Sequence, residues 1–288
     1  MAEHSKKLRK VLVAFDRYQK AHAVPGFLVA VAKKYEADDM RTQAALLTYY
    51  GFVSLFPLAL VLLTVLSFVL HRDTALAQWV LNTTVRTLPL IGGQLVNNLR
   101  TLKQSGFSLL VELIITLLGS FGLVTAFQGV INKIFGLEKR NVLTGLAKWR
   151  RNVLILLAGG GMTIVALTVP SFLDALGHGF LIRFFIFILG VILTSDAMLI
   201  VMRLVADPYV PSRSLLTSAV ISGIATQLLL HFSRLLLGHE LQHLSSLYGS
   251  FAIVLGFLFW LYLVMQITLV ALAAGAVQAR GRWRVSLT

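Results

Sequence analysis

Residues 247–279 read LYGSFAIVLGFLFWLYLVMQITLVALAAGAVQA and contain no Asp, Glu, Lys, Arg or Pro. At ~1.5 Å rise per residue, a helix of this length exceeds the ~30 Å hydrocarbon core of a bilayer. A helix in a water-soluble protein would show a polar face, whereas Gln266 is the only strongly polar side chain between Ser250 and Gln278. The stretch therefore predicts a helix that spans a membrane.

The composition of the whole chain also indicates a membrane environment. Hydrophobic residues make up 57% of the 288 residues, charged residues 13%, and the mean hydropathy is +0.81. These values are typical of an integral membrane protein. Cysteine is absent, which excludes disulfides and thiolate metal sites. Residues 1–24 are polar and basic, so we expect targeting by the first spanning helix instead of a cleaved signal.

The fold class predicted is all-α: a bundle of six transmembrane helices with amphipathic helices on its surfaces. Residues 1–43 form a cytoplasmic amphipathic segment, residues 44–279 the transmembrane domain, and residues 280–288 a basic cytoplasmic tail. The six apolar runs are approximately 44–70, 107–128, 152–172, 179–204, 214–236 and 248–276.

The net charge is +14, and the number of Lys and Arg residues in each loop indicates which side of the membrane that loop faces. With the N-terminus in the cytoplasm, twenty of the 26 Lys and Arg residues lie on the inner side and six on the outer side. The positive-inside rule then predicts a multi-pass protein of the bacterial inner membrane with both termini cytoplasmic. The excess charge favours anionic lipid headgroups as partners, and a nucleic-acid partner is not expected. The sequence does not determine the oligomeric state, and a homo-oligomer is one of the alternatives.

Four separated motifs resemble the YihY/BrkB family of bacterial inner-membrane proteins. They are the run from Asp39 through Tyr49, Tyr50 and Pro57, then residues 131–136 (INKIFG), residues 248–250 (YGS) and residues 260–262 (WLY). One departure is that residues 274–277 read AGAV where the family usually has a Gly-Ala-Glu step. The resemblance implies movement of lipids or lipid-like envelope precursors. It also carries an old ribonuclease label, which the widely separated intramembrane carboxylates disfavour.

Polar residues inside the apolar runs are candidates for a substrate path, because such side chains are costly in lipid and generally face the bundle. We expect Asp196 to point inward, with Tyr50 or Gln266 as its nearest polar partner. We also expect Glu112, Arg183 and Arg234 to converge within about 10 Å of one another in the bundle interior, since Glu112 facing hydrocarbon would be an uncompensated charge. Pairing that only stabilises the bundle is the alternative. The outer tier is Glu112, Arg183, His231 and Arg234, the inner tier is Tyr49, Tyr50, Asp196, Arg203 and Gln266, and Gln227 lies between them.

Residues 239–243 read HELQH, which matches the H-E-x-x-H zinc motif. A catalytic zinc needs a third protein ligand, and the chain has no acidic residue after Glu240 and no histidine after His243. We therefore interpret the segment as a polar outer loop, with His239 and His243 as weak metal candidates and metalloprotease activity as a minor alternative. No cofactor is expected.

The function predicted is a transporter or flippase-like protein for a lipid or another amphipathic anionic envelope precursor, with Arg183 and Arg234 meeting the headgroup. The alternative is a structural or scaffolding envelope protein without transport. No phosphate-binding loop of the G-x-x-x-x-G-K-[ST] or G-x-G-x-x-G type occurs, so an ATP-hydrolysing motor within this chain is not expected.

Overall fold

The computed structural model describes residues 23–54, 106–137, 145–176 and 179–281, and within these ranges the chain is helical without strands. This confirms the all-α class. Three helical stretches in the described part are long and apolar enough to cross a membrane, namely Leu181–Val205, Ser212–Phe232 and Val254–Arg280. The elements are α2 (Ala23–Ala37), a helix over residues 40–54, α6 (Gly106–Phe135), α7 (Gly145–Leu176), α8 (Phe180–Val205) and α9 (Ser212–Arg280).

The predicted spans correspond to these helices with one difference. The second, third and fourth spans lie in α6, α7 and α8, and the part of the first span beyond residue 54 lies outside the described residues. The fifth and sixth spans are both within α9, which is helical throughout its 69 residues. The polar loop expected between them is therefore helical in its backbone.

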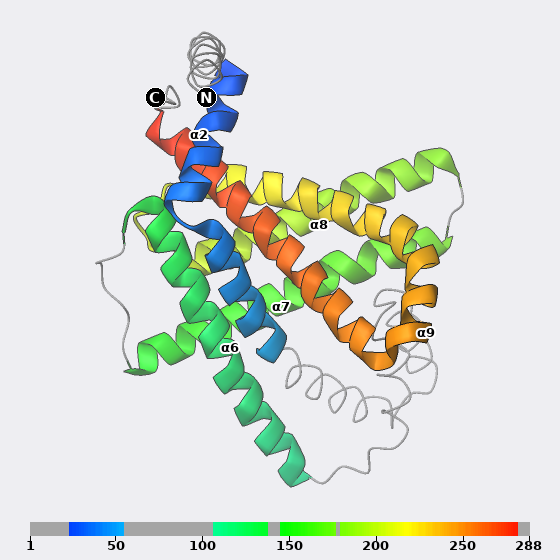
Figure 1. The fold of residues 1–288 in the computed structure, drawn as a ribbon. Helices are drawn as coiled ribbons and strands as arrows, with labels where there is room; N and C mark the ends of the chain where they lie inside the picture. The colour runs from blue at the N-terminus through cyan, green and yellow to red at the C-terminus, as the bar shows by residue number, and fades with distance from the viewer. Residues whose placement is uncertain (1–22, 55–105, 138–144, 177–178, 282–288) are drawn as a thin grey trace, which may run out of the picture.

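Helix α9 turns back on itself instead of running straight (Figure 1). Its first arm begins at Ser212. Its second arm runs back beside the first and ends at Arg280. The two arms are in contact through their side chains: the hydroxyl oxygens of Ser222 in the first arm and Thr268 in the second lie 3.5 Å apart. Helix α8 packs against both α7 and α9, so α7, α8 and the two arms form the body of the bundle.

Small residues bring the helices of this body close together. A Cβ atom added to Gly275 in the second arm would lie 2.1 Å from Ser218 Oγ and 2.4 Å from the carbonyl oxygen of Ser214 in the first arm. A Cβ atom on Gly223 would lie 2.1 Å from Ser195 Oγ of α8. Ser218 and Ser222 are fully buried. Packing of this kind is the usual way in which helices associate in lipid, where no hydrophobic effect drives them together.

Helix α8 carries its apolar side chains on the outside as well as the inside. Leu181, Phe184, Phe185 and Ile192 are all exposed. A run of exposed apolar residues on a helix this long would be a liability in water, and it suits contact with hydrocarbon.

Helix α2 packs against the second arm of α9 (Figure 1). It buries Gly26, Ala30 and Val31. At its end, the Lys34 ammonium forms an ion pair with the Asp38 carboxylate at 2.7 Å. Asp39 has a left-handed backbone (φ 50°), and its carboxylate accepts a hydrogen bond from Thr42 Oγ1 at 3.0 Å, so the chain turns here into the helix of residues 40–54.

Helix α6 ends in a Schellman motif within the INKIFG stretch. Gly136 has φ 75°, its N–H donates to the carbonyl oxygen of Lys133 at 3.0 Å, and the N–H of Leu137 donates to that of Asn132 at 2.7 Å. Glycine suits this position because a side chain would be strained at positive φ. Ile131 and Ile134 of the same stretch are buried in the core.

We expect Gly136→Ala to lower the free energy of unfolding by about 1–2 kcal/mol, the cost of a left-handed conformation for a residue with a Cβ atom. Thermal unfolding of the detergent-solubilised protein measures this loss. Gly129→Ala is the matched control, because Gly129 lies in the same helix with open space around its Cα atom. Equal unfolding temperatures for the two variants would contradict the assignment of the cap.

Candidate functional site: polar residues inside the bundle

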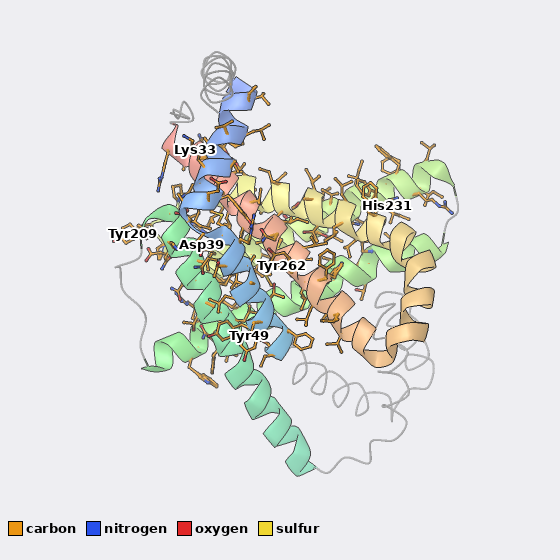
Figure 2. The ribbon with its side chains drawn as sticks, viewed as in Figure 1. Lys33, Asp39, Tyr49, Tyr209, His231 and Tyr262 are labelled. Atoms are coloured by element: carbon orange, nitrogen blue, oxygen red, sulfur yellow. The ribbon has the colours of Figure 1, made fainter. Side chains whose placement is uncertain are left out.

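A chain of hydrogen bonds crosses from α2 to the second arm of α9. Tyr35 Oη donates to Gln266 Oε1 at 2.5 Å, and Gln266 Nε2 donates to Tyr262 Oη at 2.6 Å. All three side chains are only half-buried. Tyr262 lies on the second arm of α9, near the centre of the view in Figure 2. Gln266 lies near the middle of the Val254–Arg280 stretch, so this tyrosine–glutamine chain is a polar feature at membrane depth.

A second polar contact joins α8 to the first arm of α9. Thr194 Oγ1 donates to Gln227 Oε1 at 3.4 Å, a long hydrogen bond, and Gln227 packs over Gly190. One turn further along α9, the exposed His231 ring meets Phe187 edge-on at 6.3 Å between ring centroids. Two of the predicted path residues, Gln227 and His231, therefore contact α8. His231 lies at the periphery of the bundle (Figure 2).

The third polar group lies where α6 ends, α7 begins and α8 turns into α9. Arg151 Nη2 donates to Gln128 Oε1. The carboxylate of Asp207 accepts the N–H of Tyr209 at 3.0 Å and is itself buried. Burial lowers the pKa of the Arg151 guanidinium, and the negative charge of Asp207 opposes that shift. An arginine keeps its charge despite such a shift.

Sequence reasoning did not single out Tyr35, Tyr262, Gln128, Arg151 or Asp207 as functional residues. Arg151 was counted only as a loop charge for topology, and Tyr35 lay in the segment read as a surface helix. A signal was available for one of them, since Tyr262 belongs to the WLY motif. For the others the signal is contact between distant segments, which a single sequence does not contain.

The expectation for Asp196 is wrong. Its side chain is exposed, and it has no hydrogen bond or ion pair in the part of the chain that the structure describes. Both polar ends of Gln266 bind tyrosines instead. The physical reason is rotation: Ser195 packs against Gly223 of α9, and the next residue along a helix points about 100° away.

The remaining predicted residues lie in different places. Tyr50 packs edge-on against Tyr49 and over Gly122 of α6, whereas Tyr49, Arg183 and Arg203 are exposed. Glu112 and Arg234 belong to α6 and α9, but their side chains lie outside the described part. The predicted convergence of Glu112 with Arg183 and Arg234 therefore stays a prediction.

The HELQH segment falls in the helical backbone of α9, with side chains outside the described part. Among the residues whose side chains are described, no group of three His, Cys, Asp or Glu residues could hold a metal ion. A zinc role for His239 and His243 stays a weak prediction.

We expect the double variant His239→Ala with His243→Ala to fold and to keep the zinc content of the parent protein, which we expect to be below one equivalent. Metal analysis of both purified proteins measures this. A full equivalent of zinc in the parent that disappears in the double variant would contradict it.

Comparison with known families gives a match that covers most of the chain. A family model described as Virulence factor BrkB matches residues 31–285. Comparisons with curated proteins and with solved structures found no match. The matched range includes all four motifs and each of the three polar groups described above. This chain is therefore a membrane protein of the BrkB (YihY) family.

Proposed function

We propose that this protein moves a lipid or another amphipathic anionic envelope precursor across the bacterial inner membrane. The observation that carries the proposal is the tyrosine–glutamine chain of Tyr35, Gln266 and Tyr262. Polar side chains at membrane depth are costly unless they face polar surroundings, and intramembrane polar residues commonly mark a substrate path.

The position of this hydrogen-bonded group of Tyr35, Gln266 and Tyr262 favours a substrate path over a purely structural role. A hydrogen-bonded network that only stabilises a bundle is expected to be fully enclosed, as Ser218 and Ser222 are. The three side chains of the network are instead half-buried, so part of their polar surface faces outward from the core. A hydrophilic group of a lipid passing along this surface would exchange hydrogen bonds with it.

The proposal includes an orientation with both termini in the cytoplasm, based on the distribution of Lys and Arg. We expect reporter fusions at residues 3, 140, 209 and 286 to report the cytoplasm and fusions at residues 90, 176 and 241 to report the outside. An outside result at residue 140 would contradict the six-span topology.

Reconstituted vesicles test the proposed activity directly. We expect the purified protein to speed the movement of a fluorescent anionic lipid between the two leaflets, compared with protein-free vesicles of the same composition. We expect Glu112→Gln and Arg234→Gln to abolish this movement while the protein stays folded. Absence of protein-dependent movement, with both variants losing thermal stability, would contradict transport.

The second candidate is a scaffolding protein without transport, which the packing of α8 against α9 favours. Thr268, Ser218 and Ser222 are buried between the two arms, and Gly223 leaves no space beside Ser195. The bundle is thus closed at this contact, as a scaffold would be throughout. We propose no enzymatic activity and no cofactor for either candidate.

A further inference from the structure

A line of exposed side chains runs along α8 on the side that faces away from the other helices. Its members are three, four or seven residues apart, a spacing that places them on one helical face. The apolar members are between 38% and 68% exposed. We call this face the α8 stripe, and its members are Leu181, Phe185, Ile188, Ile192, Asp196 and Arg203.

Asp196 points away from the bundle. Successive residues of a helix differ in direction by about 100°, so Thr194 and Val205 both point nearly opposite to Asp196. Both of these residues are buried, and Thr194 donates a hydrogen bond to Gln227 of α9. The packed side of α8 is therefore the side opposite Asp196, whose carboxyl group faces the surrounding lipid.

The depth of Asp196 places it within the hydrocarbon. It lies inside the apolar stretch Leu181–Val205, and α8 ends at Val205, about 13 Å further along the helix axis. The short aspartate side chain does not reach across such a distance to the headgroups. Arg203 lies two residues before the end of α8, and its long side chain can extend to the membrane surface. Asp196 is thus the member of the α8 stripe that needs a polar partner at membrane depth.

The described part of the chain does not supply that partner. Asp196 has no hydrogen bond or ion pair to any residue there. A carboxyl group is among the costliest side chains to leave in hydrocarbon, and acyl chains offer it no hydrogen bond. A polar group on another molecule in the membrane would remove this cost.

Symmetry favours a second copy of the chain as that molecule. Copies that are inserted by the same charge signals have the same orientation, so each presents Asp196 at the same depth. In a two-fold contact, a residue near the axis meets its own counterpart. Two carboxyl groups can pair when one carries a proton, because the protonated group donates a hydrogen bond and the other accepts it. A different membrane protein would have to offer a polar group at this depth by coincidence.

We infer that the α8 stripe binds a second copy of this chain, in a parallel two-fold contact that pairs the two Asp196 side chains. Phe185, Ile188 and Ile192 pack against their counterparts, as apolar residues at this spacing do where two helices meet. The two Arg203 side chains separate at the membrane surface, where headgroups and water surround them. The contact does not depend on lipid movement, and it would serve a transporter and a scaffold alike.

Cross-linking of single cysteines in the full chain tests the contact. The natural chain has no cysteine, so Ile192→Cys introduces a lone thiol one turn from Asp196 on the α8 stripe. Two cysteines form a disulfide only when their Cα atoms lie within about 7 Å. We expect oxidation in the membranes of the expressing cells to give a product of twice the chain mass on a non-reducing gel.

Ile224→Cys is the matched control. Ile224 is 42% exposed on the first arm of α9 and follows Gly223, which packs against Ser195. Its depth is therefore close to that of Asp196, but it lies outside the α8 stripe. We expect at least about tenfold less dimer from Ile224→Cys than from Ile192→Cys, because its thiols do not meet across the two-fold axis.

Two further variants of the Ile192→Cys chain test the role of Asp196. Asp196→Leu should lower the amount of cross-linked dimer roughly tenfold, the effect of losing a hydrogen bond between membrane helices. Asp196→Asn should keep the dimer, since an amide both donates and accepts. Both variants should be inserted in the same amount as the parent, because the Asp196 side chain is exposed and has no bonded partner in the described chain.

A dimer from Ile192→Cys that Asp196→Leu removes and Asp196→Asn retains supports the contact. No dimer from Ile192→Cys, as much dimer from Ile224→Cys, or a dimer unchanged by Asp196→Leu would overturn it. A cross-linked product of another mass would mean that a different membrane protein covers the α8 stripe, and this result would overturn the contact as well.

Discussion

Gly275→Ala should lower the free energy of unfolding by about 3 kcal/mol, the upper end of the usual cost of overpacking a closed core. The added methyl group would lie 2.4 Å from the carbonyl oxygen of Ser214, and backbone cannot move aside as a flexible side chain can. Because the contact joins the two arms of α9, we expect the folded yield in membranes to fall as well. The measurement is thermal unfolding in detergent together with the amount of protein inserted.

The matched control is Gly256→Ala in the same helix, since nothing lies within 4 Å of a Cβ atom there. It should be neutral or stabilise the protein by up to about 1 kcal/mol through its better helix propensity. If Gly275→Ala were as stable as Gly256→Ala, the arms of α9 could not pack as closely as described.

Gln266→Leu should slow lipid movement in reconstituted vesicles by at least about tenfold, a loss of about 1.4 kcal/mol in the stabilisation of the rate-limiting step. Leucine removes both hydrogen bonds, to Tyr35 and to Tyr262, and leaves an apolar surface at the centre of the proposed path. The rate is measured with a fluorescent anionic lipid at equal amounts of reconstituted protein.

Gln278→Leu is its control, because Gln278 is exposed near the end of the same helix and has the same change in side chain. It should leave the rate unchanged. Equal slowing by the two variants would mean that the effect comes from general loss of polarity and not from the tyrosine–glutamine chain.

Long apolar helices could be predicted from the sequence because hydropathy marks them, and three of the six predicted spans correspond to stretches of the described chain that are long and apolar enough to cross a membrane. The predicted span 179–204 matches α8 within one residue at each end, and 152–172 lies inside α7. The stretch between the fifth and sixth spans was predicted less well. It is polar and therefore looked like a loop, but it contains no proline, and its Leu, Glu and Gln residues are good helix formers, so α9 continues through it.

The partners of the polar residues could be predicted only in part. Helical rise gives the depth of a side chain, and it placed Gln266 within the last apolar run, which corresponds to the stretch Val254–Arg280. Direction depends on how a helix rotates against its neighbours, which Ser195 and Gly223 determine for α8. Asp196 was therefore assigned to the wrong side, and the pairing of Gln266 with Tyr35 of α2 could not be anticipated.

Water access at Gln266 tests the central claim, that the tyrosine–glutamine chain borders a hydrophilic path through the membrane. The natural chain has no cysteine, so Gln266→Cys introduces a single thiol. A membrane-impermeant maleimide needs a thiolate in contact with water. The account predicts that Gln266→Cys reacts in intact vesicles, whereas Val270→Cys, an exposed apolar position on the same helix, does not. Labelling of Gln266→Cys no faster than that of Val270→Cys would contradict it.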